Sequence, residues 1–162
     1  MRWSKLRRLV LDRFAPELQD RLDLQSAAYG ACSCGHAWMT WDGRVIANFC
    51  TRAHYLAQGM EQTGSAPNPI YAHHAAAFGE WSRQDAYRSC WAYIHDLSAE
   101  AALAHDDPLI RALAAADART GKRRLSSLAG DGEHRLVRLI ATLRRSPDSD
   151  LDALLAVPAL AA

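Results

Sequence analysis

The sequence lacks the features that mark several common protein classes. Among its 162 residues there are only four cysteines, and no apolar run approaches the roughly 18 uncharged residues of a membrane span. Charged residues interrupt the amino-terminal stretch MRWSKLRRLVLDRF, so it is not expected to act as a signal peptide. The expected location is therefore the reducing cytosol, where disulfides are rare, and no membrane partner is expected.

The sequence also lacks the glycine-rich and nucleophile motifs of common enzymes. It contains no GxxxxGK[ST], no GxGxxG and no GxSxG. The stretch RTGKRR has one glycine and no preceding strand, and no cysteine has a local signature that favours a catalytic thiol. No substrate or reaction is indicated, so enzymatic activity stays an open question and a non-enzymatic role is favoured.

Size and composition are typical of one globular domain. Hydrophobic residues make up 49% of the chain and charged residues 23%, which is close to the average for globular proteins. A chain of this length buries enough surface to fold without disulfides or a metal. We expect one α+β domain over residues 1–146, followed by an Ala/Leu-rich tail over residues 147–162 that is docked or frayed.

The strongest local signal is a β-hairpin centred on Asp42-Gly43. This dipeptide suits a two-residue type I′ turn, in which both residues need a positive φ. The predicted cross-strand pairs are Trp41 with Arg44, Met39 with Ile46 and Trp38 with Ala47. One face is expected to carry Trp38, Thr40, Val45 and Phe49. Residues 21–29 alternate in polarity, which predicts a third strand and an antiparallel meander.

Helical periodicity dominates the rest of the chain. It predicts helices over residues 3–14 and 80–97 and in the segments that follow, with a short helix and a loop in the less regular residues 51–71. The apolar side of the second helix is expected to carry Trp81, Tyr87, Cys90, Trp91, Ile94 and Leu97. Ser98 and Asp107-Pro108 predict helix starts, and Gly121 predicts a helix end.

Together these elements predict an α+β fold. It has an N-terminal helix, a three-stranded antiparallel sheet and a helical C-terminal half packed on the sheet.

Three of the four cysteines fall within residues 32–54, which raises the question of a metal site. A strand would point alternate residues at one face, and one helical turn would bring Cys50 to His54. The candidate zinc ligands are Cys32, Cys34, Cys50 and His54. The usual zinc knuckle, however, spaces its cysteines more widely, and a cysteine is commonly a small core residue. No metal or other cofactor is therefore favoured over a hairpin core.

Basic residues are concentrated in two segments. Residues 1–13 hold five basic and one acidic side chain, and residues 116–146 hold eight and three. Phosphate contacts need such charge, so nucleic-acid binding through the basic faces of residues 2–13 and 119–145 is one alternative. The candidate contacts are Lys5, Arg8, Arg119, Lys122, Arg123, Arg124 and Arg138. The other interpretation is that these side chains only solvate helix surfaces, and the pI near 7.8 is low for a nucleic-acid-binding domain.

The hairpin is apolar on both faces, and the chain has five tryptophans. Such a surface suits a protein partner or a homodimer. The alternative is that helices of the same chain cover both faces.

Four stretches together resemble a known family. They are RWSKLRRLVLDRF, WDGRVIANFCT, LSAEAALAHDDPLIRALAAADARTGKRRL and EHRLVRLIATLR. They are similar to a family of small, uncharacterised bacterial proteins, over roughly residues 1–145. The resemblance implies a bacterial, soluble, single-domain protein, and it supplies no activity, cofactor or catalytic residue. We expect a non-enzymatic binding or regulatory protein of the bacterial cytosol, with a nucleic-acid-binding protein or a small zinc-binding protein as alternatives.

Overall fold

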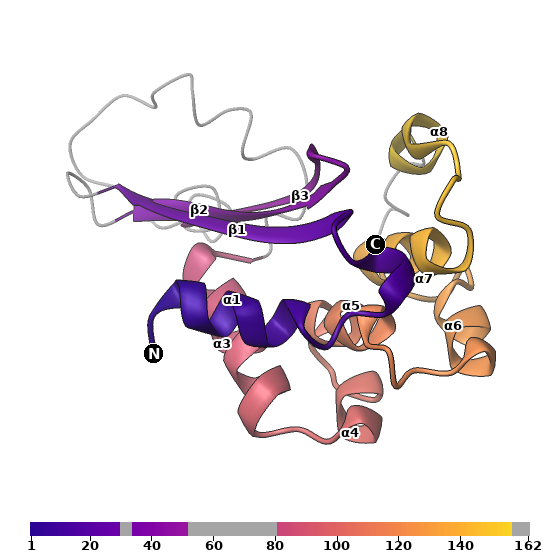
Figure 1. Cartoon of the computed structure of the whole chain (residues 1–162), viewed down its shortest axis with the longest axis horizontal. Coiled ribbons are helices and arrows are strands. Elements are labelled where there is room, and N and C mark those ends of the chain that lie inside the picture. The colour runs from indigo at the N-terminus through magenta and orange to yellow at the C-terminus, as the bar shows by residue number, and fades with distance from the viewer. Residues whose placement is uncertain (30–33, 52–80, 157–162) are drawn as a thin grey trace. The chain divides into compact units, whose positions relative to one another are not determined.

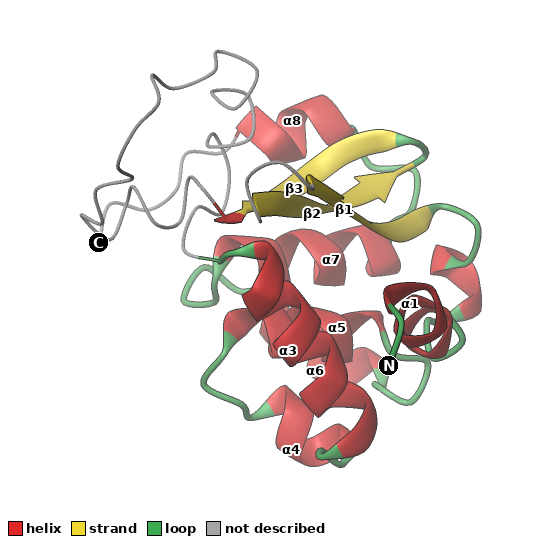
Figure 2. Cartoon of the chain, turned by 90° about the vertical axis from the view of Figure 1, so that its left-hand side faces the viewer, coloured by secondary structure: helices red, strands yellow, loops and turns green. Residues whose placement is uncertain are grey.

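The computed structural model describes residues 1–29, 34–51 and 81–156 (Figure 1). The chain divides into two compact units, which are described separately. The first unit comprises residues 1–7 and 20–89, and the second comprises residues 8–19 and 90–162. The predicted α+β class is confirmed, with an N-terminal helix, a three-stranded antiparallel sheet and a helical C-terminal half (Figure 2).

The sheet of the first unit is the predicted meander. Its strands are β1 (Leu22–Tyr29), β2 (Cys34–Trp41) and β3 (Arg44–Cys50). They lie in the order β1-β2-β3, and both neighbouring pairs are antiparallel.

The hairpin turn forms at the predicted residues. Asp42 has φ +49° and Gly43 has φ +78°, as the two central residues of a type I′ turn require. Trp41 pairs with Arg44 as predicted. Arg21 fixes this turn, because its Nη2 lies 2.7 Å from Asp42 Oδ2 and its guanidinium lies 4.4 Å from the centre of the Trp41 ring.

Beyond the turn, the predicted register is wrong by one residue. A β-bulge lies between Met39 and Thr40, so Met39 pairs with Ala47 and Trp38 pairs with Asn48. Ile46 is the extra residue of β3. Since side chains alternate along a strand, one inserted residue moves all later side chains to the other face.

The bulge changes which face carries the apolar residues of β3. Phe49 was predicted to share a face with Trp38 and Val45, but it pairs with Ala37 on the buried face instead. Val45, before the bulge, is 48% exposed. The buried residues of this face are Leu22, Leu24, Ala37, Met39, Trp41, Ala47 and Phe49.

The start of α3 (Arg83–His95) packs on the same face of the sheet. The rings of Trp81 and Phe49 meet edge to face, with centroids 5.7 Å apart. Arg83 Nε donates to Ser26 Oγ at 2.8 Å. Gly35 makes this approach feasible, because a Cβ there would clash with the Ala27 carbonyl oxygen and would lie 2.8 Å from Cδ of Arg83.

Two helix boundaries and faces differ from the predictions. The first helix, α1 (Trp3–Leu11), ends before residue 14, and the 3-10 helix η1 (Pro16–Leu18) follows it. Phe14 instead forms an isolated β-bridge with Asp117. In α3, Trp91 is 36% exposed, so its predicted core position is wrong. The buried positions of this helix are Ala86, Ser89, Cys90 and Tyr93.

The second unit is helical. Its later helices are α4 (Ala99–Leu103), α5 (Pro108–Ala116), α6 (Lys122–Leu128), α7 (Arg135–Arg145) and α8 (Leu151–Ala156). α5 and α6 both pack against α7, and α4 packs against α5. The predicted starts are confirmed, because Ser98 Oγ accepts from Ala101 N and Asp107 Oδ1 accepts from Leu109 N.

The predicted end of α5 at Gly121 is wrong. α5 ends at Ala116, and Gly121 is the N-cap of α6. Asp117 adopts an extended conformation to bridge Phe14. Thr120 then folds back, and its hydroxyl donates to the Ala114 carbonyl at 2.6 Å.

In the C-terminal segment, residues 151–156 form α8, and Leu151 is buried. None of the helices in the described ranges is both long enough and apolar enough to cross a membrane. The predictions for residues 52–71 lie outside the described residues.

Candidate anion-binding sites

The predicted zinc ligands are only partly within the described residues. Cys32 and His54 lie outside them, and only the backbone of Cys34 is described. Cys50 is buried on β3, directly opposite His36 on β2. Across residues 1–29, 34–51 and 81–156, no group of three or more His, Cys, Asp or Glu side chains could hold a metal ion. The zinc site therefore stays a prediction.

In the second unit, Arg144 on α7 closes the C-terminal end of α5. Its side chain is only 6% exposed. Nη1 donates to the carbonyls of Ala115 and Asp117, at 2.9 Å and 2.5 Å, and Nε donates to Glu17 Oε1 at 3.0 Å. The last carbonyls of a helix lack partners within it and favour a nearby cation. Arg144 thus binds three acceptors within the fold and acts as a structural cation.

Asp117 is the centre of a second saturated network. Its side chain is 2% exposed, and it accepts from the Tyr93 hydroxyl at 2.6 Å and from Arg119 Nη2 at 2.6 Å. Burial alone would raise the pKa of the Asp117 carboxyl, but these hydrogen bonds outweigh it and lower the pKa. Burial and Asp117 raise the pKa of Tyr93. Asp117 therefore stays ionised and Tyr93 neutral, which suits a structural role.

Arg111 and Glu133 form a third such network. Their side chains are 19% and 18% exposed, and Nη2 lies 2.7 Å from Oε1. Nη1 of Arg111 also donates to the carbonyls of His105 and Asp106. Burial raises the pKa of the Glu133 carboxyl, but the hydrogen bonds from Arg111 and from the His134 amide outweigh it and lower the pKa. This guanidinium, too, has its donors in use.

One corner of the second unit is strongly basic. α6 packs against α7, and Arg144 near the C-terminal end of α7 binds Glu17, on which the charge of Lys122 at the start of α6 also acts. Burial raises the pKa of Glu17, but a backbone hydrogen bond, Arg144 and Lys122 together lower it. We call this region the basic corner, and its cations are Arg119, Lys122, Arg123, Arg124, Arg144 and Arg145.

The cations of the basic corner differ in how they are paired. Arg119 and Arg144 hold Asp117 and Glu17. The other four cations, Lys122, Arg123, Arg124 and Arg145, are exposed, and in the described part of the chain none of the four has an ion-pair partner. Three of them occupy the first turn of α6, which holds no acidic residue. Cations there oppose the helix dipole, so α6 itself gains nothing from them.

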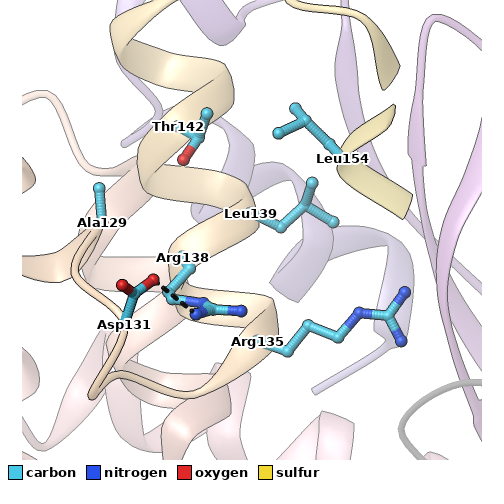
Figure 3. A pocket seen from close by; sticks show the side chains of 7 residues that line it. All are labelled: Ala129, Asp131, Arg135, Arg138, Leu139, Thr142 and Leu154. Carbon is cyan, nitrogen blue, oxygen red and sulfur yellow. Dashed lines mark hydrogen bonds and ion pairs between the residues drawn. The ribbon is translucent and has the colours of Figure 1, made fainter. Parts of the chain in front are cut away.

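A cavity of about 180 Å³ opens between α7, α8 and the loop that joins α6 to α7. Its lining residues are Ala129, Asp131, Arg135, Arg138, Leu139, Thr142 and Leu154 (Figure 3). Leu139 and Leu154 face each other across it, and the Arg138 side chain runs toward Asp131. The cavity therefore combines an apolar wall with cationic and hydroxyl groups.

The structure gathers only some of the seven predicted nucleic-acid contacts. Arg119 and residues 122–124 meet in the basic corner, whereas Arg138 lines the cavity. Lys5 and Arg8 are exposed on α1, and Lys5 belongs to the first unit.

Sequence reasoning missed the cavity. A signal was present, because Arg135, Arg138 and Thr142 are spaced three and four residues apart and so lie on one face of a helix. Outside α7, the lining comes from Ala129, Asp131 and Leu154, whose approach to that helix depends on tertiary packing.

The fold and these sites define an α+β protein with an exposed cationic surface and a small cavity, both in its helical unit. The chain belongs to the SF0329 protein family, whose characteristic sequence matches residues 2–145. No curated protein and no solved structure shows significant similarity to the chain.

Proposed function

We propose that the protein is a non-enzymatic binding protein of the bacterial cytosol, and that its basic corner contacts the phosphate backbone of a nucleic acid. One observation carries the proposal: Lys122, Arg123 and Arg124 are exposed and adjacent, without a carboxylate partner in the described part of the chain. The bacterial origin rests on the family resemblance.

Phosphate is the fitting counter-charge for this surface. A nucleic-acid strand presents a row of single negative charges, and neutralising them releases condensed counterions. Arg145 at the end of α7 is also exposed and has no ion-pair partner in the described part of the chain, so it is a further candidate for a phosphate contact. Phosphate contacts position a protein on a nucleic acid without reading bases, so we expect binding with little dependence on sequence.

The expected salt dependence is steep enough to measure. If residues 122–124 neutralise three phosphates, the slope of log K against log salt is about −2 for single strands and about −3 for duplex DNA. Between 50 mM and 200 mM salt, the affinity then falls by roughly 20- to 40-fold.

Fluorescence anisotropy with a labelled 20-nucleotide RNA and a 20-base-pair DNA tests the proposal. The corner variant carries R123Q and R124Q, while Lys122 is kept because its charge acts on Glu17. The control variant carries R44Q and R88Q, which removes the same charge from two exposed positions of the first unit.

We expect the corner variant to lose at least about tenfold in affinity and to lower the salt slope by about two, with little change in the control. Equal losses in both variants would show that net charge alone attracts the nucleic acid. That result, or an absence of binding at 50 mM salt, would overturn the proposal.

A further inference from the structure

Arg138 stands apart from the other buried arginines of the second unit. Its side chain is 15% exposed, less than the 19% of Arg111. Yet its only partner among the described residues is Asp131, through one contact of 3.3 Å. Asp131 is fully exposed, so this pair is weak. Arg144 and Arg111, by contrast, each engage a carboxylate and two carbonyls.

A single weak partner leaves the largely buried guanidinium of Arg138 with an unfavourable loss of hydration free energy. A guanidinium has five donor hydrogens in a planar fork that matches a carboxylate. Burial removes water from those donors, and the loss is offset only when another acceptor replaces it. Arg138 is also one of the residues that line the cavity between α7 and α8, so an acceptor in the cavity would supply the missing bonds.

We propose that this cavity binds a small aliphatic carboxylate, with the carboxylate on Arg138 and the hydrocarbon chain between Leu139 and Leu154. Thr142 supplies a hydroxyl from the same face of α7. The apolar wall formed by Leu139 and Leu154 receives the hydrocarbon part (Figure 3). The site goes beyond the proposed nucleic-acid contact and does not depend on it.

Size and charge narrow the class of ligand. A volume of about 180 Å³ corresponds to roughly six water molecules and is below the roughly 300–1,000 Å³ of drug-sized sites, so a nucleotide would not be enclosed. The lining holds two cations, Arg135 and Arg138, and one anion, Asp131, so its net charge of +1 matches a ligand with a single negative charge. A carboxylate monoanion with a short branched chain meets both conditions, and a phosphate dianion does not.

Isothermal titration calorimetry with sodium 4-methylpentanoate tests this site. The neutral isostere 4-methylpentan-1-ol is the matched ligand control, because it keeps the hydrocarbon chain and lacks the charge. The protein variants are R138Q, T142V and, as a control outside the cavity, R88Q. T142V keeps the shape of the side chain and removes the hydroxyl, so it provides a second reading if R138Q does not fold.

We expect the carboxylate to bind with a dissociation constant between about 10 μM and 1 mM, and the alcohol to bind at least tenfold more weakly. R138Q should weaken carboxylate binding at least tenfold and T142V several-fold, while R88Q leaves it unchanged. The proposal is overturned by equal binding of acid and alcohol, by unchanged binding in both R138Q and T142V, or by no saturation below about 10 mM.

Discussion

Two arginines on α7 differ in what surrounds them, although both are largely buried. Arg144 donates to two carbonyls at the end of α5 and to the carboxylate of Glu17, so its Nε and both hydrogens of its Nη1 are used within the fold. Among the described residues, the Arg138 side chain reaches only the exposed Asp131. Arg144 is thus bound by groups of the protein itself, whereas Arg138 has donors available for the proposed carboxylate ligand. Burial of a charged residue therefore says little about its role until its partners are counted.

The largest expected effect on stability comes from replacing Arg144, the arginine that binds three acceptors within the fold. Arg144→Met leaves the buried carbonyl of Ala115 without a donor, leaves the carbonyl of Asp117 with Thr120 N alone, and leaves Glu17 without its partner. Such losses add to about 3 kcal/mol of lost stability. Urea denaturation at pH 7 measures this change through the midpoint and the m-value. A loss below about 1 kcal/mol would show that this network contributes little to stability, and the comparison would fail.

The second prediction concerns pH. The folded-state pKa values of Glu17, Asp117 and Glu133 are all lowered. Each carboxylate therefore stabilises the fold at pH values above its unfolded pKa of about 4. This stability is lost as the pH falls through the lower folded pKa, so the urea midpoint should be level above about pH 5 and should drop toward pH 2.5.

Asp117→Asn tests whether the saturated network is responsible for this slope. The amide that replaces the carboxyl cannot ionise, so the variant is less stable at pH 7 but loses less stability between pH 5 and pH 2.5 than the parent protein. An unchanged slope in the variant would assign the acid sensitivity to other carboxylates, and a level parent curve would contradict the lowered pKa values.

Arg138→Met is expected to have a much smaller effect than Arg144→Met. It removes one long contact to an exposed carboxylate and places an apolar chain beside the apolar wall of the cavity. The change in stability should stay within about 1 kcal/mol in either direction, because exposed ion pairs contribute little and apolar replacements of buried charges are tolerated. Urea denaturation of Arg138→Met and Arg144→Met under identical conditions compares their free energies of unfolding. A loss as large as that of Arg144→Met would mean that Arg138 is structural, which would weaken the case for a ligand.

Features determined by local sequence were predictable. Asp42-Gly43 requires only its own backbone preferences to form the turn, and Ser98 and Asp107 cap helices through amides two or three residues away. The end of α5 was not predictable in this way. It depends on the bridge between Asp117 and Phe14, more than 100 residues apart in the chain. The β-bulge of β3 likewise depends on which side chains the unit buries.

The candidate sites also include features that the local sequence predicts and features that depend on tertiary contacts. The charge of residues 122–124 is visible in the sequence, and their exposure follows from the polar face of a short helix. The pairing of Arg144 with Glu17 joins residues 127 positions apart, so no local pattern indicates it. In the sequence, Arg138 and Arg144 look alike. Only the tertiary contacts show that the Arg144 side chain binds three acceptors among the described residues, whereas the Arg138 side chain binds one.

The smallest expected effect concerns Arg123 and Arg124 of the basic corner, which are exposed and have no ion-pair partner among the described residues. Arg123 and Arg124 lie in the first turn of α6, where the helix dipole disfavours cations. Replacing both with Gln should therefore raise stability by about 0.5 kcal/mol, or leave it unchanged, while nucleic-acid affinity falls.

The same denaturation experiment measures this small gain, with R44Q and R88Q as the charge-matched control that leaves α6 untouched. The substitutions at residues 123 and 124 would then raise stability and lower nucleic-acid affinity. This opposition is expected where a charge is retained for binding a partner. A stability loss above about 1 kcal/mol would instead place these arginines among the structural cations, with Arg144 and Arg111.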